Sequence, residues 1–207
     1  MVKEKRDNKT EKAILEAAFK VFTEKGFAAS RMDDIAREAK INRALLHYYF
    51  RSKDKMFDLI FAQRITEFLS GIAQQMFSEK DLKEKISGIV EHEINMLSTL
   101  PHLPIFIFQE LAQNPERIIV HAKNAGAHPG ALLKKFSAQV KTEVKKGTIR
   151  NVEPSQLLMS IMAMAIYPFI ARPIIKVMLQ LDDVQFNRLM KKRKEDVTEF
   201  IFNSLRP

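Results

Sequence analysis

The sequence predicts an all-α protein of about nine to ten helices, with a helix-turn-helix near its N-terminus. Apolar residues recur at steps of three and four along most of the chain, and no strand-like alternation persists. Only 6 Gly and 8 Pro interrupt the 207 residues. Between residues 30 and 50, two short helical segments flank a tight turn, which is the spacing of a helix-turn-helix.

The composition excludes several classes of protein. With no Cys, the chain has no disulfide framework, no thiol nucleophile and no Cys-ligated zinc or iron–sulfur site. The first 25 residues contain no apolar signal segment. The most apolar stretch, residues 157–171, is shorter than the roughly 20 residues that a membrane-spanning helix needs. We therefore expect a soluble, cytoplasmic protein with no membrane partner.

The first two helices are marked by their ends. Residues 1–9 are polar and basic and are expected to form a tail. The first helix then runs from about residue 10 to Lys25, and Gly26 follows as a stop signal. Ser30, with Asp33 three residues later, resembles a capping box and predicts the start of the second helix.

The later helices are predicted from caps and from breaks in periodicity. After a break at Lys40-Ile41, Asn42 caps a third helix over about residues 43–49, and Ser52 caps a long fourth helix that reaches about Ser78. Pro154 suits the first position of a helix. Beyond residue 80 we expect helices over about 82–99, 104–113, 117–123, 130–146, 155–180 and 184–204.

Positive charge is concentrated near the N-terminus. The formal net charge is +9; residues 1–55 hold 14 Lys and Arg against 9 acidic residues, and the other 152 hold 20 against 16. Arg51, Lys53 and Lys55 lie at the start of the fourth helix, where the helix dipole disfavours each cation by a few tenths of a kcal/mol. A bound polyanion would reverse that sign. These cations, beside outward-facing Tyr48 and Tyr49, favour nucleic-acid binding by residues 30–55 over a solvated helical hairpin.

Residues 13–60 resemble the N-terminal domain of the TetR family of bacterial transcriptional regulators. The resemblance is carried by Gly26-Phe27, Asp34-Ile35-Ala36, the run Leu46-His47-Tyr48-Tyr49-Phe50, and Ser52-Lys53-Asp54-Lys55. It implies an N-terminal three-helix DNA-binding domain over 10–52, to which the fourth helix contributes as far as residue 55. It also implies a larger helical bundle over 53–207 that binds a ligand and dimerises. The resemblance further implies a transcriptional regulator, most often a repressor in this family, that binds a palindromic operator in double-stranded DNA as a homodimer.

The resemblance also implies which residues contact DNA. Ser30 and Arg31 would touch phosphate at the start of the second helix. The third helix would present Arg43, Ala44, Leu45 and His47 to the bases or the groove, and Tyr48, Tyr49 and Lys53 would hold the DNA backbone. Two departures from the family pattern bear on this assignment. Lys40 replaces the usual turn Gly, at a cost on the order of 1 kcal/mol, and Leu45 and His47 are unusual in the recognition helix, so base preference does not transfer.

The C-terminal two thirds is less specific. The resemblance implies that the last two long helices form the dimer interface, although their apolar stripes also suit an intramolecular core. The candidate interface residues are Leu158, Ile161, Ala165, Phe186, Leu189, Met190, Val197, Phe200 and Ile201. Met and Phe side chains suit a deformable apolar cavity, although they also suit a filled core. The candidate ligand residues are Met96, Phe106, Phe108, Gln109, Met159, Met162 and Tyr167.

Other functions are less well supported by the sequence. The histidine spacing matches no compact metal site, and no nucleophile elbow, phosphate-binding loop or zinc-protease motif occurs, so we expect no metal, no cofactor and no enzymatic activity. The alternative is a basic helical protein that binds a membrane surface or a protein partner without sequence-specific DNA recognition. We expect any effector to be a small apolar or amphipathic molecule. The sequence names neither the operator nor the effector, nor the direction in which the effector acts.

Overall fold

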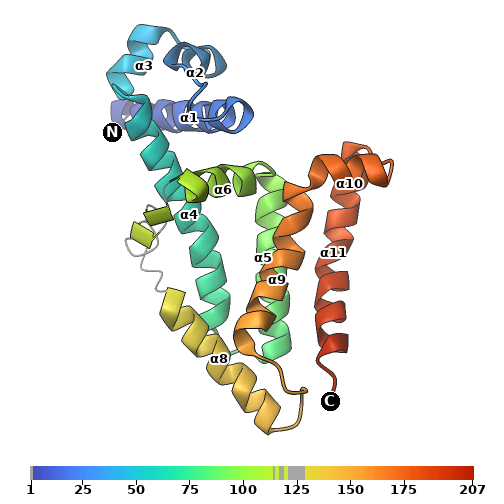
Figure 1. Cartoon of the computed structure of the whole chain (residues 1–207). Coiled ribbons are helices and arrows are strands. Elements are labelled where there is room, and N and C mark those ends of the chain that lie inside the picture. The colour runs from blue at the N-terminus through green and yellow to red at the C-terminus, as the bar shows by residue number, and fades with distance from the viewer. Residues whose placement is uncertain (1, 114, 117–118, 121–128) are drawn as a thin grey trace.

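The structure is a computed structural model, which describes residues 2–113, 115–116, 119–120 and 129–207 (Figure 1). These residues form ten helices and no strand, which confirms the all-α prediction. The expected helix at 117–123 falls largely outside the described residues. The helices are α1 (Val2–Lys25), α2 (Met32–Glu38), α3 (Arg43–Tyr49), α4 (Lys53–Phe77), α5 (Leu82–Thr99), α6 (Leu103–Gln113), α8 (Pro129–Lys145), α9 (Pro154–Ile170), α10 (Arg172–Met178) and α11 (Asp183–Ser204).

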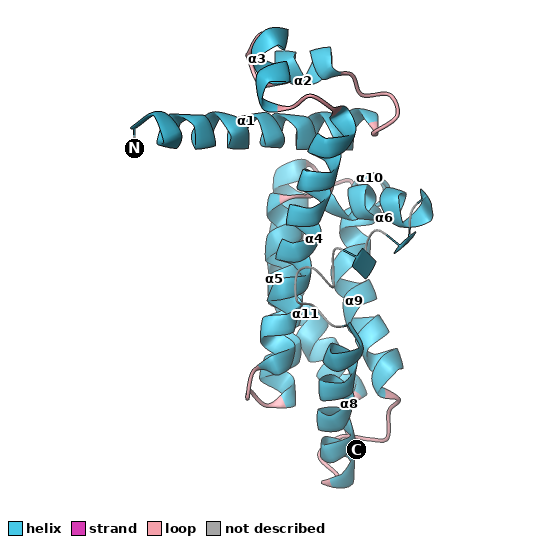
Figure 2. Cartoon of the chain, turned by 90° about the vertical axis from the view of Figure 1, so that its left-hand side faces the viewer, coloured by secondary structure: helices cyan, strands magenta, loops and turns pink. Residues whose placement is uncertain are grey.

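The first three helices form a small head at one end of a longer bundle (Figures 1 and 2). Ile14 and Phe22 of α1, Ile35 of α2 and Leu46 of α3 are buried in its core, because each lies on the apolar stripe of its helix. The turn between α2 and α3 places Lys40 at a φ of 56°, which is the left-handed geometry expected from the sequence. The long helix α4 joins the head to the bundle.

Two expectations for the start of the chain are wrong. Residues 2–9 are not a separate tail, because α1 begins at Val2 and no Gly or Pro interrupts it before Lys25. The second helix begins after Arg31 and not after Ser30: the backbone N–H of Arg31 donates to the carboxylate of Asp34 at 3.2 Å. The caps of α3 and α4 agree with the sequence, since Asn42 accepts from the N–H of Leu45 and Ser52 from that of Lys55.

Helices α4 and α5 pack closely side by side in the bundle. The imidazole of His92 on α5 fills the space that a Cβ at Gly71 on α4 would need, and the side chain of Gln75 does the same at Gly88. The buried ammonium of Lys85 donates to the carbonyl oxygen of Met76 at 3.0 Å, which satisfies one of the free carbonyls at the end of α4. Small residues on each helix therefore set the distance between the two helices.

The single helix expected over residues 155–180 is two helices. α9 ends at Ile170, and α10 continues from Arg172 at an angle of 74°. Pro173 lies at the start of α10, where its ring and missing N–H are tolerated, and it prevents a straight continuation of α9. Within the described residues, no single helix is long and apolar enough to cross a membrane; the bent α9–α10 pair reaches that length and composition only together.

Most residues expected at the dimer interface lie in the core of the subunit. Leu158 is half-buried, whereas Leu189 and Phe200 on α11 are exposed. The apolar stripes of α9 and α11 face each other and α5, so burial within one subunit accounts for six of the nine candidates. The residues reassigned to the core are Ile161, Ala165, Phe186, Met190, Val197 and Ile201.

Candidate nucleic-acid interface

The outer surface of α3 offers four side chains to a partner. Leu46 points into the head and is fully buried, so the positions around it on the helix face outward. Arg43, Ala44, Leu45 and Tyr48 are exposed, and Tyr48 is 75% exposed. A purely structural helix has no reason to expose Leu45 and Tyr48 on one short face, whereas a groove-binding helix does.

The polar groups of this surface are connected to one another. Arg43 forms an ion pair with Asp33 of α2 at 3.4 Å, and its Nε–H donates to Nε2 of His47 at 3.4 Å. Both contacts are long and exposed, so a phosphate or a guanine edge can replace them at little cost. The ring of Tyr48 lies edge-on to that of Tyr49, with centroids 5.3 Å apart, and Tyr49 is half-buried.

Two of the expected phosphate contacts face inward. Ser30 is 3% exposed, and its hydroxyl donates to the carbonyl oxygen of Gly26. The ammonium of Lys53 donates to the carbonyl oxygens of Phe27 and Ser30 at 2.8 and 3.0 Å and lies 4.3 Å from the centroid of the Phe27 ring. In this conformation Lys53 fastens the α1–α2 loop to α4 and the Ser30 hydroxyl is used within that loop, so neither side chain is presented outward as the sequence led us to expect.

Three other cations are exposed at the same end of the molecule. Arg31, Arg51 and Lys55 have no carboxylate within ion-pair distance among the described residues. In the sequence, Arg51 and Lys55 stand out as cations at an unfavourable helix end, but the expected DNA contacts did not include them. Their position beside α3 makes them candidates for phosphate binding.

Two acidic groups of α2 are paired with lysines of α1. A hydrogen bond and ion pair from Lys25, at 2.7 Å, lower the pKa of Asp34, to which the N–H of Arg31 also donates. Glu38 pairs with Lys20 at 2.7 Å. Both pairs join α1 to α2, so neither carboxylate is paired with Arg31, Arg51 or Lys55.

Comparison with known proteins identifies the head. The family model described as "Bacterial regulatory proteins, tetR family" matches residues 14–60, which extend from α1 into α4. The chain belongs to the TetR family. It is therefore a DNA-binding transcriptional regulator, and the alternative of a membrane-surface protein is not favoured.

The similarity to TetR-family relatives extends into the bundle. The Bacillus subtilis regulator YhgD is 26% identical over 143 residues, which cover 69% of this chain and 73% of the relative. FadR from Bacillus subtilis, solved with stearoyl-CoA, has a TM-score of 0.60 at 17% identity and covers 94% of this chain and 98% of its own. AibR, solved with isovaleryl coenzyme A and operator DNA, has a TM-score of 0.63 at 17% identity over 96% and 98%. The two structures show that the fold is shared along nearly the whole chain.

The residues expected to bind a TetR-family effector do not form one cluster. Phe106 is buried between the head and the bundle, where its ring contacts those of Phe19, Phe57 and Phe61 at centroid distances of 5.4, 5.1 and 5.8 Å. Phe108 and Gln109 are exposed on α6. Phe106 is thus part of the junction between head and bundle and is corrected from a ligand contact to a packing residue.

The other expected ligand residues divide between the inside and the outside of the bundle. Met96 of α5 and Met162 of α9 are half-buried and pack against the core. Met159 and Tyr167 are 55% and 60% exposed, on the opposite side of α9 from buried Ile161. Met159 and Tyr167 are therefore corrected from ligand contacts to surface residues.

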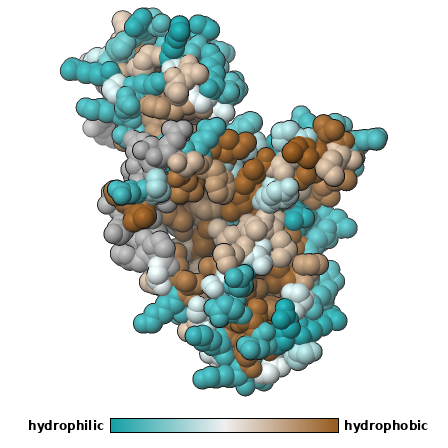
Figure 3. All heavy atoms as spheres, in the orientation of Figure 1, coloured by the Kyte–Doolittle hydropathy of each residue, from teal (hydrophilic) through white to brown (hydrophobic). Residues whose placement is uncertain are grey.

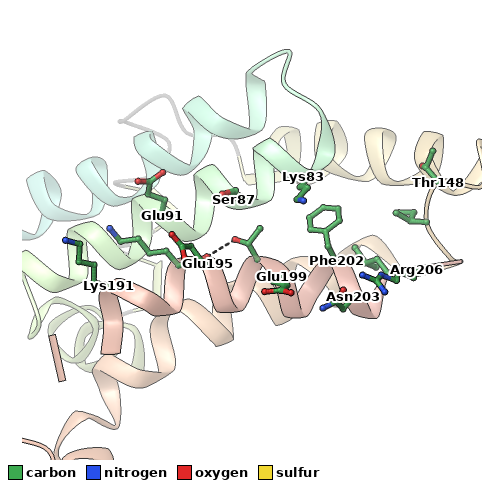
Figure 4. A pocket seen from close by; sticks show the side chains of 14 residues that line it. Lys83, Ser87, Glu91, Thr148, Lys191, Glu195, Glu199, Phe202, Asn203 and Arg206 are labelled. Atoms are coloured by element: carbon green, nitrogen blue, oxygen red, sulfur yellow. Dashed lines mark hydrogen bonds between the residues drawn. The ribbon is translucent and has the colours of Figure 1, made fainter. Parts of the chain in front are cut away.

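A groove of about 870 Å³ lies elsewhere, between α5 and α11 (Figure 4). None of the expected ligand residues lines it. Its walls carry charges of both signs around the ring of Phe202, with Lys83 and Glu91 from α5 and Lys194 and Glu195 from α11. The groove is open and polar, so it does not provide the apolar cavity that was expected for the effector.

Proposed function

We propose that this protein is a repressor that binds a palindromic operator as a homodimer and is regulated by a small apolar or amphipathic effector in its C-terminal bundle. The observation that carries the proposal is the exposed face of α3, with Arg43 and Tyr48 at its centre. We place the domain boundary at about residue 52, so that residues 10–52 bind DNA with help from the first turn of α4 and residues 53–207 bind the effector and the second subunit.

In this proposal the residues of the head have distinct tasks. Arg43, Ala44, Leu45 and His47 face the bases of the major groove, because they lie on or beside the exposed face of α3. Tyr48 and Tyr49 contact the DNA backbone. Arg31, Arg51 and Lys55 add phosphate contacts at the positions that Ser30 and Lys53 do not provide. Phosphate contacts set the position of the head on DNA, and the α3 contacts set its sequence preference.

The second subunit is proposed to dock on the exposed sides of α9 and α11. Met159 and Tyr167 of α9 and Leu189 and Phe200 of α11 are large apolar side chains that remain exposed in the single chain. Helices that expose apolar residues on one side and pack on the other form four-helix interfaces with a symmetric copy. A dimer also supplies the second head that a palindrome requires.

The effector is proposed to bind within the bundle, among α4, α5, α6 and α9. Met96 and Met162 provide deformable apolar surface there. The two solved relatives that carry stearoyl-CoA and isovaleryl-CoA support an amphipathic ligand. The aromatic contacts of Phe106 connect α6 to both α1 and α4, so a displacement of α6 by the effector would be transmitted to the head.

A mobility-shift experiment tests the proposal. The full-length protein is titrated against the DNA that flanks its own gene and against an unrelated fragment of equal length, at several salt concentrations. We expect the flanking DNA to shift at a protein concentration at least about a thousandfold lower than the unrelated DNA does. The shifted complex should contain two chains for each palindromic site. Equal affinity for both fragments at all salt concentrations would contradict sequence-specific binding.

A further inference from the structure

One carboxyl group lies at the centre of the bundle. Glu93 of α5 is 0% exposed, although glutamate is among the residues that are almost never fully buried without a partner. It stands in the middle of the buried face of its helix, while Glu91 and Asn95, two positions away on either side, are exposed. Its neighbours on that face are Ile86, Ile89, Val90 and Leu97, all buried.

Neither oxygen of this carboxyl group has a hydrogen-bond partner among the described residues. Burial alone raises the pKa of Glu93 to about 8, so the group carries a proton at neutral pH. Buried polar groups are nearly always paired in folded proteins, and an unpaired one calls for an explanation such as a functional role.

The helices packed against α5 supply no donor to Glu93. α9 contains no Asp, Glu, Lys, Arg or His, and its Tyr167 is exposed. Arg64 of α4 is bound to Glu16 and Glu67. The buried side chains of α8 and α11 are apolar apart from Thr198, whose hydroxyl donates to the carbonyl oxygen of Lys194. The apolar ones are Leu132, Phe136 and Val140 on α8, and Phe186, Met190, Val197 and Ile201 on α11.

The remaining polar groups near α5 have other roles. Lys85 donates to Met76, and Arg193 of α11 donates through Nε to the carbonyl oxygen of Met164. His92 lies against Gly71 on the α4 side, and its Nε2 has no partner among the described residues. Glu110 of α6 is itself acidic and buried, so it offers no cation. Glu93 therefore lacks hydrogen-bond donors among the described residues around it.

From this arrangement we propose that Glu93 holds the polar end of an amphipathic amine, whose N–H groups donate to both carboxyl oxygens while its aliphatic part lies against the apolar interior. The inference rests on the proposed function, because it identifies the chemical class of the effector. An ammonium brings several donors and a compensating charge to one buried carboxylate. A carbonyl or a carboxylate brings only acceptors and would leave at least one oxygen of Glu93 without a donor.

The apolar part of such a ligand has suitable surroundings. Met96 lies one turn beyond Glu93 on α5, and Met162 and Ile166 lie on α9; all three are half-buried and pack against the core. Apolar side chains also reach the surface on the side of the bundle shown in Figure 3. The formal charge of +9 disfavours adsorption of a cation to the surface of the protein, so binding of an amine points to a local acidic site.

The proposal requires proton release on binding. Protonated Glu93 and the ammonium form a carboxylate–ammonium pair, and the proton of Glu93 passes to the buffer. Affinity for the amine therefore rises about tenfold per pH unit below pH 8 and levels off above it. A neutral ligand that accepts a hydrogen bond from the carboxyl group would release no proton and would bind less well above pH 8.

The test uses three probes with one chain length, dodecylamine, dodecanol and dodecanoate, below their micelle concentrations. Isothermal titration calorimetry of the full-length protein at pH 7, in two buffers of different ionisation enthalpy, measures affinity and proton release. We expect dodecylamine to bind at least about tenfold more tightly than the other two probes and to release close to one proton per site. Glu93→Gln should remove the proton release and the preference.

The exposed neighbour supplies the matched control. Glu91→Gln makes the same substitution at an exposed position of the same helix and should leave amine binding and proton release unchanged. Equal binding of dodecylamine and dodecanol, absence of amine binding, or unchanged proton release in Glu93→Gln would each overturn the proposal. Circular dichroism verifies that each variant is folded. A mobility shift of the same preparation without probe tests DNA binding separately, so failure of the amine site and failure of the proposed function are distinguishable.

Discussion

The Nε–H of Arg193 on α11 donates to the carbonyl oxygen of Met164 on α9 at 3.0 Å. This carbonyl is the one that residue 168 would satisfy in a regular helix, and residue 168 is Pro, which has no N–H. The arginine thus replaces a helical hydrogen bond and joins the two helices at the same point. Desolvation accordingly lowers the pKa of Arg193, which is half-buried.

Loss of this contact should weaken the α9–α11 pair. Arg193→Met keeps most of the side-chain packing but leaves the Met164 carbonyl without a donor, and we expect a loss of about 1–3 kcal/mol in the free energy of unfolding. Unfolding in urea, monitored by circular dichroism at a fixed protein concentration, measures this free energy. Arg188→Met, at an exposed position of α11, is the control and should change little. Equal stabilities of the two variants would show that the contact contributes nothing.

Arg51 should contribute to DNA affinity through charge alone. Arg51→Ala removes one phosphate contact per subunit, so the slope of log affinity against log salt should fall by about two for a dimer. The side chain is exposed and has no ion-pair partner among the described residues, so thermal stability should not change. Lys141→Ala removes an exposed cation on α8 and is the comparison. If it lowers the salt slope as much as Arg51→Ala does, Arg51 does not belong to the interface.

Arg43 should contribute to sequence preference. Arg43→Ala should cost about 1–3 kcal/mol of binding to the operator, with a much smaller loss on unrelated DNA. Competition between the operator and single-base variants, measured by fluorescence anisotropy of labelled DNA, gives the specificity ratio. Arg37→Ala, an exposed arginine of α2, should leave this ratio intact. An identical loss on all sequences would make Arg43 a phosphate contact.

A substitution at Phe200 tests whether the exposed side of α11 forms the proposed dimer interface. Phe200→Arg places a charge on a side chain that is 63% exposed in the single chain, so it should dissociate the dimer without unfolding the subunit. Analytical ultracentrifugation at micromolar concentration gives the mass. Phe77→Arg, at an equally apolar and 51% exposed position on α4, should remain dimeric. A dimeric Phe200→Arg protein would place the interface elsewhere.

Glu93 should make stability fall as pH rises. Its pKa is about 8 in the folded chain and ordinary in the unfolded chain, so between these values the folded state binds more protons than the unfolded state. The favourable contribution is complete below the unfolded pKa and is lost as pH rises through about 8, by roughly 1.4 kcal/mol per unit in between. Glu93→Gln should flatten the dependence of unfolding free energy on pH from 6 to 8. Glu91→Gln should not flatten it.

Local signals in the sequence determined the helices and the head. The Asn42 and Ser52 caps, the turn at Lys40 and the spacing of α2 and α3 were predictable because each involves residues within about one helical turn. The resemblance to the TetR family was visible for the same reason, because it rests on short runs of residues such as Leu46 to Phe50 and Ser52 to Lys55.

The partners of individual side chains were decided only by the tertiary structure. Ser30 and Lys53 lie at positions that suit phosphate contacts, but they bind the backbone carbonyls that the fold brings beside them. The stripes on α9 and α11 could not be assigned from periodicity, because a subunit core and a dimer interface use the same apolar residues. Glu93 is one acid among 25 in the sequence. Its unusual chemistry arises from the helices that close around it, because burial without a donor depends on residues distant in the chain.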